Sequence, residues 1–282
     1  MLPPAILIMT TSNENNSCFN GLTTVNLELT NRCNKKCWMC GRRKIEAESP
    51  GKMVFDRDMD ISLVRRIAEQ LPSDIVVQFH NNGEPLLYER LPEALDFFKR
   101  QVRCFDTNGK LLVKRAADII GRVDTVTVST FERDEEWKEQ FELVKEFLSI
   151  KGNAGPRLII RCLGEIGEDR LALYKATGCL LVPRVLHSPD GSFKYVKLPV
   201  IPEVGFCIEI MGHMAINTAG HVSFCVRFDP ERHGVIGDAS KDELADIWNS
   251  RKRREYIRAH IEGRRDSLKL CGACHYWGVP RG

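Results

Sequence analysis

The sequence predicts an α/β protein with a parallel sheet, followed by a smaller C-terminal domain. From residue 23 to residue 186, apolar strand-like runs alternate with segments of helical periodicity about six times. Regular alternation of this kind gives parallel strands joined by right-handed crossovers. After residue 188 the pattern changes to a hairpin signal, one helical segment and four of the eleven cysteines. A doubly wound sheet is the generic outcome for the first part.

The strand-like runs are short, apolar or alternating, and bounded by turn residues. They lie at residues 23–30, 75–79, 102–106, 123–129, 157–162 and 180–186. Between them, apolar residues recur at helical spacing. These helical segments lie at residues 58–71, 91–100, 111–120, 134–150 and 169–177. Pro72 ends the first helix, and a segment rich in glycine and proline at 152–156 follows the fourth.

The C-terminal part has its own pattern. Asn-Thr-Ala-Gly at residues 217–220, between two apolar runs, predicts a β-hairpin. Residues 242–261 predict a single helix. We therefore expect four parts along the chain. They are a tail at 1–20, an α/β domain at 21–188, a linker at 189–206 and a small domain at 207–282.

Composition excludes several classes of protein. The chain has 282 residues, with hydrophobic and charged fractions of 43% and 28%, which are ordinary for a globular protein. The net charge of +3 gives no reason to expect nucleic acid as a partner. No run approaches the roughly 20 apolar residues that span a bilayer, and no signal peptide is evident. Eleven cysteines in such a chain are expected to be reduced, cytoplasmic and metal-bearing.

The strongest signal is the segment 31–40, which reads NRCNKKCWMC and directly follows the first predicted strand. Cys33, Cys37 and Cys40 must lie on one tight loop, and thiolates grouped in this way suit an iron–sulfur cluster. Because only three are supplied, one iron of a four-iron cluster would be left open to a small molecule. The alternatives are a zinc site, which prefers four ligands, or unrelated buried thiols.

This spacing resembles the cysteine signature of the radical S-adenosylmethionine (SAM) enzymes. The resemblance implies a partial (β/α)6 barrel, similar to an incomplete TIM barrel, with ligands at the carboxyl ends of the strands. It also implies that the open iron binds SAM. Reductive cleavage of SAM would then give methionine and a 5′-deoxyadenosyl radical, which abstracts a hydrogen atom from a substrate carbon.

Other residues at predicted strand ends resemble the SAM contacts of this family. The segment Asn82, Gly83, Glu84 and Pro85 resembles the Gly-Gly-Glu-Pro element that holds the SAM amino group, with Asn82 in place of the first glycine. Gly83 would allow a close backbone approach, and a carboxylate beside an ammonium is favourable. An ordinary proline-containing turn is the alternative. The resemblance implies further cofactor contacts from Met39, Asn108 and Ser129.

The C-terminal cysteines form a second set, consisting of Cys207, Cys225, Cys271 and Cys274. With Gly220 ahead of Cys225, their layout resembles the SPASM extension of radical SAM proteins in its short twitch form, a hairpin plus a helix with one auxiliary cluster. Four cysteines would fully ligate a [4Fe–4S] cluster, the second in the chain. A structural zinc site and a thioredoxin-like pair are the alternatives.

These resemblances imply an oxidoreductase. A closed auxiliary cluster could accept an electron from a substrate radical, which would make the net reaction an oxidation. A short chain with one such cluster resembles the 2-deoxy-scyllo-inosamine dehydrogenases, which oxidise a secondary alcohol on an aminocyclitol. Arg184, at the end of the sixth strand, or His187, just after it, could orient the hydroxyl. A flavodoxin- or ferredoxin-type electron donor is also implied.

Three alternatives remain open at this point. A peptide- or protein-modifying radical SAM maturase is the second hypothesis, although about twenty N-terminal residues cannot form a peptide-recognition domain. Resemblance to GTP 3′,8-cyclase is weaker, because that family leaves an iron open on its second cluster. The non-enzymatic alternative is a metal-binding regulatory module. The sequence identifies neither the substrate, the catalytic base nor the oligomeric state.

Overall fold

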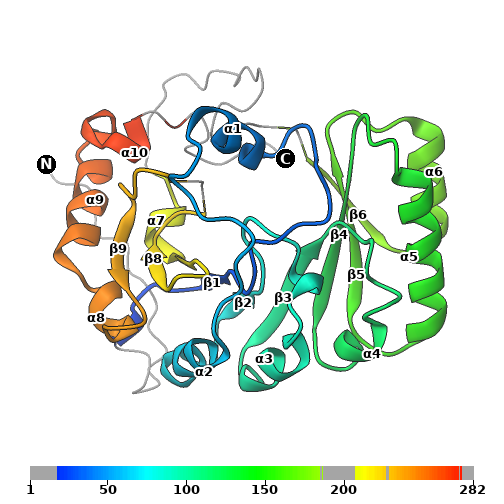
Figure 1. Ribbon diagram of the computed structural model, residues 1–282, viewed down its shortest axis with the longest axis horizontal. Helices are drawn as coiled ribbons and strands as arrows, with labels where there is room; N and C mark the ends of the chain where they lie inside the picture. Colours follow the sequence, from blue (N-terminus) through cyan, green and yellow to red (C-terminus); the bar gives the residue numbers. More distant parts are fainter. Residues whose placement is uncertain (1–17, 185, 187–206, 227–228, 273, 275–282) are drawn as a thin grey trace, which may run out of the picture.

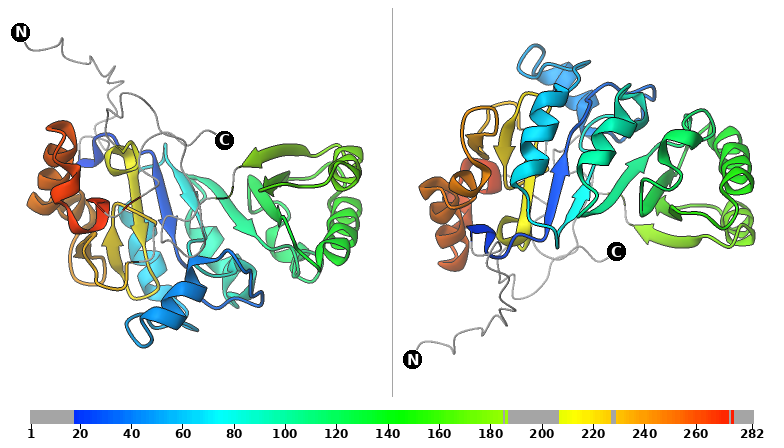
Figure 2. Two further views of the ribbon diagram at one scale, coloured as in Figure 1. Left: turned by 90° about the horizontal axis from the view of Figure 1, so that it is seen from above. Right: turned by 90° about the horizontal axis from the view of Figure 1, so that it is seen from below.

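The computed structural model describes residues 18–184, 186, 207–226, 229–272 and 274. Six parallel strands form the first part of the sheet, in the order β6-β5-β4-β3-β2-β1. Their bounds are Thr24–Leu27 (β1), Val76–Gln78 (β2), Val102–Thr107 (β3), Thr125–Phe131 (β4), Arg157–Leu163 (β5) and Leu180–Arg184 (β6). A doubly wound sheet would reverse this order partway. The strictly sequential order confirms the predicted partial barrel, which is open and curved in Figure 2.

The crossover helices follow the convex face of the sheet (Figure 1). Their bounds are Ile61–Gln70 (α2), Leu91–Phe97 (α3), Ala116–Ile119 (α4), Trp137–Lys151 (α5) and Glu168–Ala176 (α6). The side chain of Asp60 begins α2 by accepting a hydrogen bond from the backbone N–H of Ser62 at 2.8 Å. Gly152, in the left-handed region at φ 52°, ends α5. A further helix, Gly41–Glu48 (α1), directly follows the cysteine loop.

Side chains along each strand point alternately to the buried core and to the opposite, concave face of the sheet. Val25 and Leu27 of β1 belong to one buried apolar cluster with Val64 and Ile67 of α2. Because successive side chains of a strand point to opposite faces, the intervening residues face the concave side. That side carries many polar residues, namely Asn26, Glu28, His80, Asp106, Ser129, Arg161 and Arg184.

The C-terminal part extends the same sheet. Its first strand pairs in parallel with β1, placing Met214 opposite Val25, and the two following strands are antiparallel. These strands are His213–Ile216 (β7), His221–Ser223 (β8) and Val235–Asp238 (β9). Their helices are Glu209–Gly212 (α7), Leu244–Trp248 (α8), Arg251–Ile261 (α9) and Lys269–Gly272 (α10). Figure 1 shows α8 and α9 at one end of the sheet, and α5 and α6 at the other.

The structure confirms the predicted hairpin as β7 and β8, but the single helix predicted at 242–261 is wrong. The chain breaks at Asn249 and Ser250, where Ser250 Oγ accepts a hydrogen bond from the N–H of Arg253 and begins α9. The apolar periodicity of the sequence continues through this break, so the periodicity alone did not reveal that Ser250 begins a new helix. The helix predicted at 111–120 is reduced to α4. Among the described residues, no helix is long and apolar enough to cross a membrane.

Candidate active site

The loop that follows β1 gathers the first three predicted cluster ligands. The backbone N–H of Cys40 donates to the carbonyl of Cys37 at 3.2 Å, which folds the loop back just before α1. All three thiols are partly exposed. Burial raises the pKa of Cys37 to about 12, and the nearby Cys40 and Cys33 thiolates add to this effect. Three thiols that influence one another in this way are close together in space.

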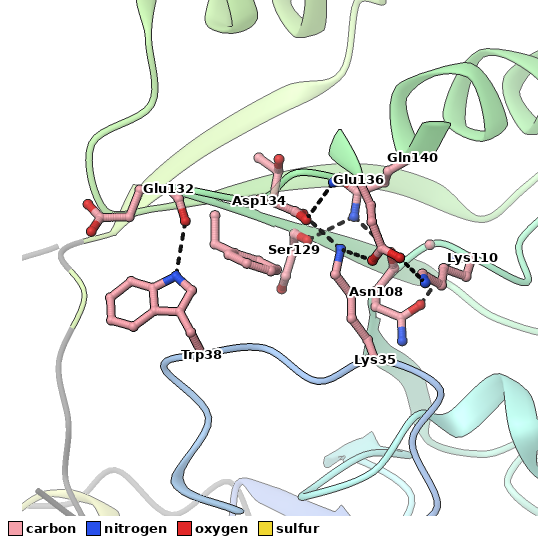
Figure 3. Close-up of polar contacts among 12 residues, drawn as sticks. Lys35, Trp38, Asn108, Lys110, Ser129, Glu132, Asp134, Glu136 and Gln140 are labelled. Atoms are coloured by element: carbon pink, nitrogen blue, oxygen red, sulfur yellow. Dashed lines mark hydrogen bonds and ion pairs between the residues drawn. The ribbon is translucent and has the colours of Figure 1, made fainter. Parts of the chain in front are cut away.

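A buried ion pair, with further polar contacts around it, fixes this loop over the end of β4 (Figure 3). Lys35 Nζ lies 2.8 Å from Asp134 Oδ2, and both side chains are at most 5% exposed. Lys35 also lies 3.4 Å from Glu136, which Lys110 contacts at 2.6 Å. Trp38 Nε1 donates to the carbonyl of Glu132 at 3.3 Å. Removing one partner of a buried pair is costly, so these contacts position the loop firmly.

Two predicted cofactor contacts, Asn108 and Ser129, meet at this rim. Gln140 of α5 donates to the carbonyls of both, at 2.7 Å and 3.0 Å (Figure 3). The side chain of Asn108 also donates to that of Asn34 in the cysteine loop at 2.8 Å. Met39 lies half-buried in the same loop. The ends of β3 and β4 are therefore joined to the loop that carries the first cysteine set.

The segment after β2 packs directly against the start of the cysteine loop. The N–H of Glu84 donates to the carbonyl of Arg32 at 2.8 Å. The Glu84 carboxylate is buried and accepts from Thr107 Oγ1 and the Asn108 N–H, both at 2.8 Å, and from the Leu86 N–H at 3.1 Å. Burial raises the pKa of Glu84 to about 7, although these donors oppose the shift. Glu84 thus ties the end of β2 to the end of β3.

A second buried carboxylate, Glu28, ties the barrel to the C-terminal hairpin. Its two oxygens accept from the backbone N–H of Asn82 at 3.1 Å and from that of Thr218 at 3.2 Å. Burial raises the pKa of Glu28, and these two hydrogen bonds oppose that shift. Pro85 begins a short 3-10 helix, Pro85–Leu87 (η2), that leads away from the site. The segment 82–85 is therefore anchored twice, by Glu28 through the N–H of Asn82 and by its own Glu84 through Thr107 and Asn108.

A cavity of about 140 Å³ lies between the end of β2 and the C-terminal hairpin. Its lining is mostly polar and includes Glu28, Asn82, His221, Ser223, Cys225 and Arg232. Since Cys225 belongs to the second cysteine set and Asn82 to the rim beside the first, the cavity lies between the two sets. Its volume is below that of a drug-sized pocket, so it suits a small polar molecule.

A charged cluster on the concave face was missed by sequence reasoning. His80 Nδ1 accepts from the N–H of Asp106 at 3.0 Å, its Nε2 lies 3.4 Å from Asp106 Oδ2, and Arg161 pairs with the same carboxylate. Burial lowers the pKa of His80 to about 3, assisted by the charges of Arg161 and His213. His80 is therefore neutral, with its proton on Nε2. A charged residue within the apolar run Leu-Ile-Ile-Arg161 was the signal that could have revealed this cluster.

A second missed pair lies at the start of the C-terminal part. His213 contacts Glu209 through Nδ1 and Asn26 through Nε2. The Asn26 amide nitrogen in turn donates to the carbonyl of His80 at 2.9 Å. The hydrogen bond from His213 lowers the pKa of Glu209, and the charge of Arg184 lowers it further. The predicted residue Arg184, at the end of β6, is therefore electrostatically coupled to the C-terminal part. His187 lies outside the described residues.

The four cysteines of the second set gather around α7, α9 and α10. Burial raises the pKa of Cys207, and charges on Glu209 and Cys274 raise it further. Cys271 is buried in an apolar cluster that Cys225 also contacts. The N–H of Cys274 donates to the carbonyl of Cys271 at 3.1 Å. The structure thus brings the second predicted ligand set together, as it does the first.

Both sets consist of cysteine thiols, the ligands that an iron–sulfur cluster needs. Within the described residues, no three His, Cys, Asp or Glu side chains converge on one point that could hold a single metal ion. The thiols of a four-iron cluster each bind a different iron, so they need no common point. Among the residues that the structure describes, the buried Nε of Arg43 near the first set has no hydrogen-bond partner. Within the same residues, the buried Nε2 of His260 near the second set has none either. Both are donors that an anionic cluster could satisfy.

Comparisons with known proteins agree with this geometry. Residues 207–275 match the SPASM family, an iron–sulfur cluster-binding domain. The S-adenosyl-L-methionine-dependent 2-deoxy-scyllo-inosamine dehydrogenase of Niallia circulans is 23% identical over 261 residues, covering 89% of this chain and 92% of that protein.

Two solved structures show the same fold. A crystal structure of BtrN in complex with AdoMet and 2-DOIA has a TM-score of 0.63 at 19% identity, covering 90% of this chain and 93% of that one. Streptococcus suis SuiB bound to precursor peptide SuiA has a TM-score of 0.62 at 14% identity, covering 90% of this chain and 70% of that one.

Proposed function

We propose that this chain, a radical SAM enzyme with a SPASM iron–sulfur domain, oxidises a secondary alcohol on a small polyhydroxylated molecule such as an aminocyclitol. The observation that supports this most is the polar cavity beside Cys225, between the two cysteine sets. The dehydrogenase of Niallia circulans acts on 2-deoxy-scyllo-inosamine, and this chain spans 92% of that protein's length. A small polar cavity and an alignment that spans 92% of that dehydrogenase both favour a small-molecule substrate.

The proposed cofactors are SAM and two [4Fe–4S] clusters, one held by Cys33, Cys37 and Cys40 and one by the second cysteine set. When bound, they supply a 5′-deoxyadenosyl radical, formed with one electron from a flavodoxin- or ferredoxin-type donor, and an acceptor for one electron. With these groups bound, the alcohol carbon would lose a hydrogen atom to the deoxyadenosyl group, the hydroxyl would release its proton, and the auxiliary cluster would accept the remaining electron. One electron would enter from the donor and one would leave to the auxiliary cluster, so the formation of a ketone, methionine, 5′-deoxyadenosine and one proton would balance.

Residues of the chain would bind and orient SAM and the substrate. Gly83 and Glu84 hold the rim where SAM would bind, because both contact the loop that carries the first cysteine set or its neighbours. Arg184, whose charge lowers the pKa of Glu209, would orient the substrate hydroxyl from the end of β6. His80 is neutral and can only donate from Nε2, so it serves as a hydrogen-bond donor rather than as a base.

A peptide substrate is the second candidate, supported by the likeness to SuiB bound to its precursor peptide. This chain covers 70% of SuiB, whereas it covers 93% of BtrN in the complex with AdoMet and 2-DOIA. The small-molecule assignment therefore has the stronger support.

The test uses reconstituted, reduced full-length protein with SAM and 2-deoxy-scyllo-inosamine deuterated at its carbinol carbons. We expect deuterium in 5′-deoxyadenosine and one ketone formed per deoxyadenosine. The variant Cys33→Ala/Cys37→Ala/Cys40→Ala is the matched control and should form neither product. Deoxyadenosine without deuterium, together with unchanged aminocyclitol, would contradict this substrate class and favour the peptide alternative.

A further inference from the structure

His260 of α9 is held against the second cysteine set by a hydrogen bond from one of its members. The backbone N–H of Cys207 donates to His260 Nδ1 at 3.3 Å. The side chain is buried, with 3% of its surface exposed. Because Nδ1 accepts this hydrogen bond, the proton of the neutral ring resides on Nε2. The orientation of the ring is thus fixed by a predicted cluster ligand.

The Nε2–H group is a buried donor without an acceptor among the described residues. Buried polar groups almost always have a hydrogen-bond partner, because an unpartnered one loses its hydration for nothing in return. A buried donor beside the second cysteine set, without an acceptor among the described residues, is available to a partner that a bound ligand supplies. The sulfur atoms of an iron–sulfur cluster accept hydrogen bonds of this kind.

The surroundings of the ring place it among the cysteines. Burial lowers the pKa of His260, and the nearby charge of Arg265 lowers it further. Arg265 also donates to the carbonyls of Cys271 and Cys274. One turn earlier on α9, Tyr256 packs in the apolar cluster that contains Cys271. His260 therefore has contacts or near neighbours that involve three of the four cysteines.

We infer that His260 donates a hydrogen bond from Nε2 to a sulfur of the auxiliary cluster and thereby raises its reduction potential. The direction follows from charge: the reduced cluster carries one more negative charge, so a hydrogen-bond donor stabilises it more than the oxidised form. In an alcohol oxidation this favours transfer of the substrate electron to the auxiliary cluster. The inference depends on the auxiliary cluster of the proposed function, and His260 acts through that cluster as a positioning residue.

The test measures the midpoint potential of the auxiliary cluster by EPR-monitored titration. Full-length protein carrying Cys33→Ala/Cys37→Ala/Cys40→Ala is used, so that only this cluster titrates. Adding His260→Leu should lower the equilibrium constant for reduction about tenfold, which is about 59 mV for one electron. Adding His260→Gln keeps a donor and should restore most of the shift. His233→Gln, which removes another histidine of the same domain, should leave the potential unchanged.

Each outcome decides a separate point. If the Cys33→Ala/Cys37→Ala/Cys40→Ala protein contains no iron or sulfide, the assignment of an auxiliary cluster is wrong. The proposed role of His260 is then wrong as well. An intact cluster whose potential is the same with His260 and with Leu would overturn the role of His260 alone. If the Leu variant does not fold, pulsed EPR of the reduced wild-type cluster with ¹⁵N-labelled histidine gives the answer. A histidine nitrogen coupling that His260→Gln abolishes supports the hydrogen bond, and the absence of any coupling in the wild type contradicts it.

Discussion

Gly83 lies directly against the backbone of Thr30, so that a Cβ at position 83 would lie 2.2 Å from the Thr30 carbonyl oxygen. It would also lie 2.7 Å from the Cα of Asn31 and 2.9 Å from the carbonyl oxygen of Arg32. These are backbone atoms, which cannot move aside as the tip of a side chain can. The segment after β2 and the start of the cysteine loop therefore form one unit that only glycine permits.

Replacing Gly83 by Ala should separate these two segments. We expect the free energy of unfolding to fall by about 1–3 kcal/mol, the usual cost of an added group in a packed site. Iron bound by the first cysteine set should also become more labile to chelators. Urea denaturation and timed iron release measure both effects. Gly167→Ala is the matched control, because a Cβ there meets nothing within 4 Å. Equal stability of the two variants would contradict the close approach.

Glu84→Gln tests whether the buried carboxylate also binds the SAM ammonium. Most of the hydrogen bonds that it accepts from Thr107, Leu86 and Asn108 can be kept by the amide, but the charge is lost. We expect SAM to bind about tenfold more weakly, the magnitude of one charge-assisted hydrogen bond, with unchanged iron content. Equilibrium dialysis with labelled SAM measures the affinity. An unaltered affinity would assign Glu84 to the loop structure alone.

Particular elements show which parts of the fold can be predicted from the sequence and which cannot. Alternation and turn residues predicted all six parallel strands, because each strand is buried on its helix-facing side and must be apolar there. The family resemblance predicted the sequential barrel order, which the alternation alone left open. The helix break at Ser250 was not predicted, because the apolar spacing of residues 242–261 runs through it unchanged. Local capping outweighed periodicity at that position.

In the candidate site, too, residues that are close in sequence could be predicted and residues that meet only through long-range contacts could not. The cysteine sets and the 82–85 segment are local in sequence, so spacing revealed them. The concave-face cluster takes Asp106 from β3, Arg161 from β5 and His80 from just after β2, and only the arrangement of the sheet brings these residues together. The pairing of β7 with β1, which brings His213 to Asn26, is also a long-range contact. Single-sequence patterns carry no information about such contacts.

His80 makes a pH-dependent contribution to stability. Its pKa falls from 6.5 to about 3 on folding, under burial and the charges of Arg161 and His213, with Asp106 facing it as the opposing charge. As the pH falls, His80 is therefore protonated in the unfolded chain before it is protonated in the folded chain. The stability contributed by His80 is complete above pH 6.5 and is lost as the pH falls toward 3. We expect a loss of about 1 kcal/mol between pH 6.5 and 5.5, from this group alone.

Urea denaturation of wild type and His80→Gln across that range measures this loss. The variant should lack this part of the pH dependence, because glutamine does not titrate. Identical slopes for the two proteins would mean that His80 titrates normally in the folded state.

Iron content tests the two cysteine sets separately. Anaerobically reconstituted protein should hold about eight irons and eight sulfides, two clusters of four. Cys33→Ala/Cys37→Ala/Cys40→Ala should retain about half of each. Iron, zinc and acid-labile sulfide analysis on the same samples gives the result. Zinc without sulfide in the wild type would favour a regulatory metal site, and full iron content in the triple variant would remove the N-terminal cluster.

The most direct test of alcohol oxidation with an auxiliary electron acceptor is the ratio of oxidised product to 5′-deoxyadenosine in Cys271→Ala/Cys274→Ala. Circular dichroism must first show the variant folded, and iron analysis must show the second cluster lost, since metal loss can unfold a small domain. We expect deoxyadenosine to form still, because the first cysteine set and Glu84 are intact. The ratio, one in the wild type, should fall at least tenfold because the substrate radical has no acceptor. A folded variant that lacks the second cluster and keeps a ratio of one would contradict the electron-acceptor role.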